Sequence, residues 1–268
     1  MLPNLLKMFV LTSALACIAG PSYSQALTNY HHNLFWGRIT ISDRITDRLK
    51  WEVYLQYRAQ NDDVDKWNIF KHHQVTSYWL WLHYQAAKDL RVSVTPFCYF
   101  NTIAYFPQPA EVGNRGINEY RWAVQLEHTA NLKYFQFANR YSVEYRLRDI
   151  QTPEAFVPNY RIRYRAKLEM PLKRDKHPIR LILFDEVFLE FGKAVESSPA
   201  VFNQNRLYAG FSYEFVKNIK CNLGYMYLIQ ERLSGTAIDT SNTLWATLTF
   251  DNLVSQIFRR NNKPESKK

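Results

Sequence analysis

Residues 119–127 read EYRWAVQLE, a stretch in which charged or polar side chains alternate with aromatic or aliphatic ones. Successive side chains of a β-strand point to opposite faces. Glu119 and Arg121 therefore share one face of the predicted strand, whereas Trp122 and Val124 share the other. A strand of this kind separates a polar environment from an apolar one.

The same alternation recurs along most of the chain. We predict eleven strands, near 34–43, 49–58, 71–83, 90–100, 118–128, 134–147, 159–170, 179–191, 203–215, 219–230 and 242–250. Strands of about ten residues match the tilted span of a bilayer. Short connections alternate with long ones, which we place at 59–70, 101–117, 148–158, 192–202 and 231–241. Short turns at one end and long loops at the other are typical of outer-membrane barrels.

The predicted fold is an all-β, antiparallel, up-and-down transmembrane β-barrel of about 12 strands, within a range of 10–12. When eleven strands alternate in direction, the first and the last run the same way. A barrel with an even number of strands therefore needs one more strand. Ala26–Asn33 is the candidate for that strand, although it is short.

The chain divides into three parts. Residues 1–24 are predicted to be a signal peptide, with Lys7 before an apolar run and small residues before a cut at Gln25. Cys17 raises lipidation as an alternative, although the spacing of its lipobox-like residues favours ordinary cleavage. Residues 25–250 form the predicted barrel, and 251–268 form a basic C-terminal tail.

Composition narrows the classes of partner. The formal net charge is +10, but no recognition helix or compact basic patch is present, so nucleic acid is not an expected partner. Adjacent histidines of a strand point apart, so the pairs His31-His32 and His72-His73 do not predict a metal site. No cofactor is expected. Cys98 and Cys221 fall on apolar faces, which predicts free, lipid-facing thiols.

Alternation alone leaves open which face lines the interior. A soluble periplasmic ligand-binding barrel would place its apolar face around a ligand. The many large aromatic residues, the alternating loop lengths and the mixed charges of the polar face favour the opposite arrangement. The expected location is therefore the cell outer membrane of a Gram-negative bacterium, with membrane lipid as partner and a monomeric state.

The polar face carries 13 basic and eight acidic residues, a difference of +5. Arginine and carboxylate form bidentate pairs that compensate charge in a confined interior. The network either only fills and stiffens the barrel, or it lines a narrow, anion-preferring pore for small anions. Its candidate residues are Glu119, Arg121, Arg140, Glu144, Arg146, Arg161, Arg163, Arg165, Glu186 and Arg206.

Eight aromatic residues are predicted to narrow any opening and to make a wide porin-like channel unfavourable. They are Tyr54, Tyr78, Phe97, Tyr99, Phe184, Phe188, Tyr208 and Trp245.

Catalytic residues are not predicted, and the chain is not expected to be an enzyme. A lipid-modifying enzyme, a hydrolase or acyltransferase, would need a reactive serine or histidine near the membrane surface. His128 has the parity of the apolar face and Ser142 that of the polar face, so the two should not meet.

Several short motifs stand in an order that resembles a known family. They include Glu119-Tyr120-Arg121-Trp122, Tyr160-Arg161-Ile162-Arg163-Tyr164, Asp185-Glu186-Val187-Phe188 and Asn203-Gln204-Asn205-Arg206-Leu207-Tyr208. Together they resemble the domain-of-unknown-function 2490 family of predicted outer-membrane proteins, over Trp36 to Phe250. The resemblance implies a barrel in the outer membrane, and it implies no activity.

Overall fold

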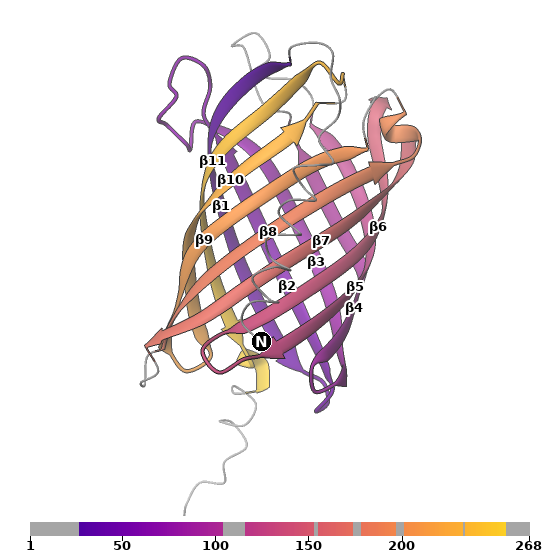
Figure 1. The fold of residues 1–268 in the computed structure, drawn as a ribbon. Helices are drawn as coiled ribbons and strands as arrows, with labels where there is room; N and C mark the ends of the chain where they lie inside the picture. The colour runs from indigo at the N-terminus through magenta and orange to yellow at the C-terminus, as the bar shows by residue number, and fades with distance from the viewer. Residues whose placement is uncertain are drawn as a thin grey trace, which may run out of the picture.

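The computed structural model describes residues 27–103, 116–152, 155–173, 178–196, 201–232 and 234–255. Within these residues, eleven strands close into one barrel (Figure 1). They are β1 (Thr28–Arg44), β2 (Leu49–Gln60), β3 (His72–Ala87), β4 (Leu90–Thr102), β5 (Ile117–Asn131), β6 (Gln136–Thr152), β7 (Ala155–Lys173), β8 (Ile179–Phe191), β9 (Phe202–Val216), β10 (Ile219–Glu231) and β11 (Ala237–Asp251).

The predicted signal peptide, residues 1–24, and most of the predicted tail, from residue 256, lie outside the described residues. A single 3-10 turn, η2 (Lys193–Val195), follows β8. No helix in the described part of the chain is both long and apolar enough to cross a membrane.

The barrel closes through a parallel pair of strands. Consecutive strands are antiparallel, and β1 pairs with β11 in parallel from Thr28↔Ala237 to Ser42↔Asp251. An odd number of alternating strands leaves the first and last strands pointing the same way, so only a parallel pair can close the sheet. The prediction of about 12 strands is close. However, Thr28–Asn33 lengthens β1 and does not form a twelfth strand.

All eleven predicted strands are present, but two predicted long connections are much shorter than expected. β6 continues to Thr152 and β7 begins at Ala155, so most of 148–158 belongs to a long hairpin. β11 begins at Ala237, inside the predicted loop 231–241. Both predictions were wrong because polar residues such as Arg148 and Asp239 continue the inward-facing alternation beyond the apolar part of the strand.

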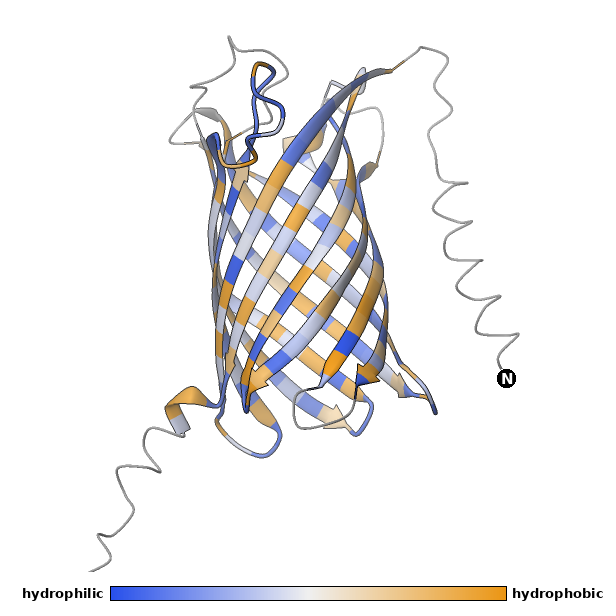
Figure 2. Cartoon of the chain, turned by 90° about the vertical axis from the view of Figure 1, so that its left-hand side faces the viewer, coloured by the Kyte–Doolittle hydropathy of each residue, from blue (hydrophilic) through white to orange (hydrophobic). Residues whose placement is uncertain are grey.

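Side chains are segregated between the two faces of the sheet. On β5 the buried residues Glu119 and Arg121 point into the barrel, whereas Val124 on the outer face is 55% exposed. Figure 2 shows hydrophobic and hydrophilic positions alternating along the strands. The polar face therefore lines the interior, which is the reverse of the arrangement expected for a soluble carrier with an apolar interior.

A β-bulge in β4 reverses the predicted orientation of three side chains. The pairing with β5 shifts between Thr95 and Tyr99, around Pro96, which has no N–H for the ladder. One added residue reverses the alternation. As a result Cys98 is buried inside the barrel at 1% exposure, whereas Phe97 is 51% exposed on the outer face. Tyr99 also lies on the outer face, next to the exposed Tyr78 and Tyr120.

Tyr78 was also predicted to face inward and instead lies outside, 47% exposed. β3 carries aromatic or aliphatic residues on both faces between Tyr78 and Leu82, so its composition gives no contrast from which to assign a face. The other predicted inward aromatics, among them Tyr54 and Phe188, are inside the barrel.

Candidate functional site

The interior contains a network of arginines and glutamates on β5, β6, β7 and β8. Glu119 on β5 accepts hydrogen bonds from Arg121 on its own strand and from Arg146 on β6, the latter at 2.7 Å to Oε2. The Nε of Arg148 lies 3.5 Å from the same carboxylate. The register pairs Arg121 with Arg146 across β5 and β6, so Glu119 is needed to separate two adjacent guanidinium groups.

Glu144 on β6 lies at the centre of this network and is fully buried. Its carboxylate is 2.7 Å from Arg161 Nη2, 2.5 Å from Arg163 Nη1 and 3.3 Å from Arg121 Nη1. Three guanidinium groups therefore share one fully buried carboxylate. Charge-assisted contacts of this kind are strong in a dry interior, and each partner depends on the others.

Two glutamates on β8 complete the network. Glu186 is bound by Arg140 at 2.6 Å and by Arg163 at 2.7 Å. Glu190 is bound by Arg146, and Arg161 lies 3.6 Å away. The charged wall therefore extends without interruption from β5 to β8.

Eight of the ten predicted network residues are joined in this way, and the remaining two are attached differently. Arg165 lies 3.7 Å from Glu127, on a neighbouring part of the inner wall. Arg206 on β9 donates a hydrogen bond to Gln204, and its guanidinium lies over Trp36 at 4.9 Å and Phe188 at 4.4 Å.

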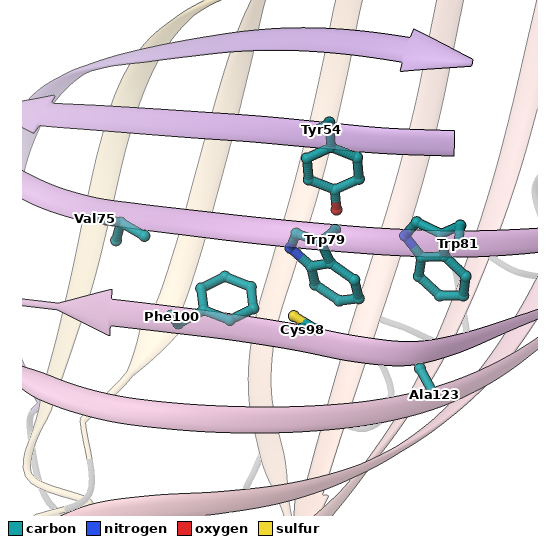
Figure 3. Close-up of a cluster of buried hydrophobic side chains, with 7 residues drawn as sticks. All are labelled: Tyr54, Val75, Trp79, Trp81, Cys98, Phe100 and Ala123. Carbon is teal, nitrogen blue, oxygen red and sulfur yellow. The ribbon is translucent and has the colours of Figure 1, made fainter. Parts of the chain in front are cut away.

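Aromatic clusters cover the rest of the inner wall. One cluster lies on β2–β5, where Trp79 stacks on Tyr54 and on Trp81 and meets Phe100 edge to face (Figure 3). The other is formed by buried residues of β1 and β8–β10, with Trp245 packed against it. Fully buried interior residues such as Trp36, Met226 and Leu228 leave little room along much of the barrel.

An axial cavity of about 370 Å³ remains between these walls. All eleven strands contribute to its lining, which reaches from mid-barrel residues such as Arg38 and Arg163 to Thr102 and Glu231 at the ends of β4 and β10. Those strand ends lie on the side of the long connections. Nine arginines and four carboxylates line the cavity.

Sequence reasoning missed several residues of this region. Arg148, Arg232 and Asp239 were assigned to loops, yet all three line the cavity. Arg232 donates to both oxygens of Asp239, which also contacts the buried His32 at 2.8 Å. The sequence did contain a signal for Arg148. It follows Arg146 by two residues, so the alternation of the strand continues and places both arginines on the same face.

Two arrangements of histidine and serine bear on a possible hydrolytic site. His128 is half exposed on the outside near Asp89, and Ser142 is buried inside, so these two residues do not meet. Inside the barrel, the His83 ring lies 2.8 Å from Ser93 Oγ and 3.8 Å from Glu52. This order of side chains is that of a hydrolytic triad. However, Ser93 is buried, and it faces the interior, away from the outer surface where lipid would lie.

Within the described residues, no group of three or more histidine, cysteine, aspartate or glutamate side chains could hold a metal ion. Cys98 and Cys221 are both free cysteines.

Three receptors are among the solved structures with some similarity to this chain. The siderophore receptor PirA from Pseudomonas aeruginosa matches with a TM-score of 0.33 and 15% identity, over 76% of this chain and 34% of the receptor. A mutant of the ferric enterobactin receptor PfeA from the same organism gives 0.32 and 12%, over 75% and 37%. PirA from Acinetobacter baumannii gives 0.30 and 13%, over 82% and 41%. The chain thus spans well under half the length of each receptor.

The comparison with curated proteins found no match. A family model described as "Protein of unknown function (DUF2490)" matches residues 33–239, which run from β1 into β11 and include the whole arginine and glutamate network. This chain is therefore a member of the DUF2490 family.

Proposed function

We propose that this protein is an outer-membrane β-barrel whose arginine and glutamate network stiffens a narrow, anion-preferring interior. The observation that carries the proposal is the segregation of side chains, with ionised groups inside and Leu, Val and aromatic residues outside. A largely apolar outer face is unfavourable in water and favourable against hydrocarbon. Asp185 is an exception on this face, and its carboxylate accepts a hydrogen bond from Asn205. A closed barrel also pairs its backbone polar groups internally, as a bilayer requires.

The excess of arginine over carboxylate in the cavity supports the preference for anions. Nine guanidinium groups face four carboxylates there, and a low-dielectric wall strengthens the resulting field. We propose membrane lipid and small anions as partners, a monomeric state and no enzymatic activity. Turnover of phospholipid or lipopolysaccharide by the purified protein would contradict the last point.

Location can be tested by fractionation. When the full chain is expressed in a Gram-negative bacterium, we expect it in the outer-membrane fraction, soluble only with detergent. Unheated samples should migrate differently from boiled ones on a denaturing gel, because a closed barrel resists the detergent. Recovery in buffer without detergent would favour a soluble periplasmic barrel.

Ion selectivity can be tested in planar bilayers. We expect small conductance steps with a reversal potential that favours anions, because fixed positive charge enriches counter-ions. Arg38→Glu should move the reversal potential toward cations, since Arg38 lines the cavity. Lys193→Glu makes the same charge change on the exposed turn η2 and should leave selectivity unaltered. Silent bilayers would reduce the proposal to a rigid scaffold.

A further inference from the structure

The loop between β2 and β3, residues 61–71, has a defined internal structure at the rim of the long connections. The carboxylate of Asp62 accepts hydrogen bonds from the backbone N–H groups of Val64 and Asp65, at 3.1 and 2.7 Å. Its other oxygen lies 3.1 Å from the ring of His72 on β3. Further hydrogen bonds join backbone groups within the loop. The loop therefore presents its side chains from a fixed backbone.

The same loop is attached to the outer side of the barrel. On β1, the backbone N–H of Asn33 donates to Asn61 Oδ1 at 2.7 Å, and the side-chain amide of Asn33 donates to the backbone oxygen of Lys66 at 2.8 Å. The centre of the Phe70 ring lies 4.7 Å from that of Phe35. Phe35 points outward, because its neighbours along β1 are buried inside the barrel. The loop thus lies against the outer face.

Three apolar side chains of this loop are exposed. Trp67 is 87% exposed, Val64 80% and Phe70 59%, and the first two are the most exposed large hydrophobic residues of the described chain. Such exposure is unfavourable in water, and a loop with a fixed backbone does not relieve it by folding back. In Figure 1 the loop, in purple at the upper left, projects sideways beyond the barrel wall. These three side chains therefore form an apolar patch beside the barrel.

The apolar outer face leads directly to this patch. Phe35 pairs in register with Leu244 of β11, which is 41% exposed, and Tyr57 on β2 is 44% exposed. The contact between Phe35 and Phe70 connects this part of the wall to the loop. A surface that faces hydrocarbon along the barrel thus ends in a tryptophan at its rim. Tryptophan favours the boundary between hydrocarbon and headgroups, where its ring is in apolar surroundings and its N–H remains hydrated.

We propose that the β2–β3 loop is a lipid-binding anchor, which inserts Trp67 at the boundary between headgroups and hydrocarbon in the leaflet next to this rim. Val64 and Phe70 lie at the same boundary. The loop has three acidic and two basic residues, so binding relies on apolar contact and does not require an anionic headgroup. The inference rests on the proposed outer-membrane location and identifies the segment that fixes the rim at the lipid surface.

Quenching by brominated lipid tests the anchor in the full chain, folded into phosphatidylcholine vesicles. The chain has seven tryptophans, so the emission of Trp67 is taken as the difference between the parent and Trp67→Leu. Bromines near the headgroup end of the acyl chains should quench this emission about threefold more strongly than bromines near the chain ends, because the ring lies at the boundary. Aqueous iodide should quench it little, and added phosphatidylglycerol should change neither result.

Trp122→Leu is the matched control, because Trp122 lies on the outer face of β5 and is 42% exposed. Its difference emission should be quenched by brominated lipid whether or not the loop binds. Gel mobility of unheated samples verifies that each variant is folded. If Trp122 is not quenched, the proposed location fails and the anchor with it. If Trp122 is quenched while Trp67 responds to iodide alone, the anchor is overturned and the location stands. Shielding of Trp67 from iodide without quenching by bromine also overturns it, since protein then covers the loop.

Discussion

Replacing Glu144 by glutamine is expected to lower the free energy of unfolding by about 3–5 kcal/mol, the usual cost of breaking a buried ion pair from one side. Glu144 is fully buried and binds Arg121, Arg161 and Arg163. The substitution keeps the shape of the side chain, so the loss is electrostatic. It leaves three largely buried guanidinium groups close together with no carboxylate between them. The measurement is urea unfolding of the barrel in phospholipid vesicles, followed by tryptophan fluorescence.

Two further variants make the Glu144 result specific. Glu196→Gln removes the same charge from an exposed position beyond η2 and should shift stability by less than about 0.5 kcal/mol. Glu144→Gln combined with Arg163→Gln should be less destabilised than Glu144→Gln alone, because one uncompensated positive charge is gone while Glu186 keeps Arg140. Equal loss in the single and double variants would show that charge compensation is not the cause.

Gly224→Ala is expected to destabilise the barrel by about 3 kcal/mol, at the upper end for an overpacked site. Gly224 on β10 pairs with Gly210 on β9, and the ring of Tyr208 lies over the space that both glycines leave. A Cβ at Gly224 would lie 2.5 Å from Tyr208 Cζ and 2.7 Å from the backbone oxygen of Ala209. The oxygen belongs to the sheet and cannot move aside, so the strands themselves must shift. Urea unfolding in vesicles again provides the measurement.

Gly37→Ala is the matched control for this prediction, because a Cβ there would lie 3.0 Å from the side chain of Phe35 but 3.8 Å from the backbone oxygen of Tyr57, an ordinary contact. The ring of Phe35 can rotate away, so the loss should stay below about 1 kcal/mol. In a Tyr208→Ala background, Gly224→Ala should cost less than in the parent, since the contact with the ring is removed and the contact with Ala209 stays. An undiminished cost would exclude Tyr208 as the obstacle.

Much of the fold could be predicted because the interior and exterior of the barrel impose opposite demands on alternate residues. On β5 and β7 the two faces differ so strongly that the strand and the division of its residues between two faces follow from the order of residues. Prediction was wrong where this contrast is absent or interrupted. Tyr78 lies on a strand with apolar residues on both faces, and Phe97 follows a bulge at Pro96 that a simple alternation does not reveal.

The candidate site was predictable as a set of residues and not as an arrangement. Parity alone places Glu144 and Arg163 on the inner face, but it does not say which arginine binds which glutamate. Arg163, for example, binds Glu144 on one neighbouring strand and Glu186 on the other. Arg38 shares the parity of the paired arginines, yet it lies against Tyr54 and Trp245. That difference depends on side chains of strands at the closing seam.

The residue order by itself determined the strands and the division of residues between their two faces, because these depend on a local period of two residues, and its short motifs carried the family resemblance. Only the tertiary structure decided the number of strands in the closed sheet, the parallel seam between β1 and β11 and the axial cavity. Closure joins residues about two hundred positions apart, such as Thr28 and Ala237, and the space inside depends on how all eleven strands pack together. No local pattern contains that information.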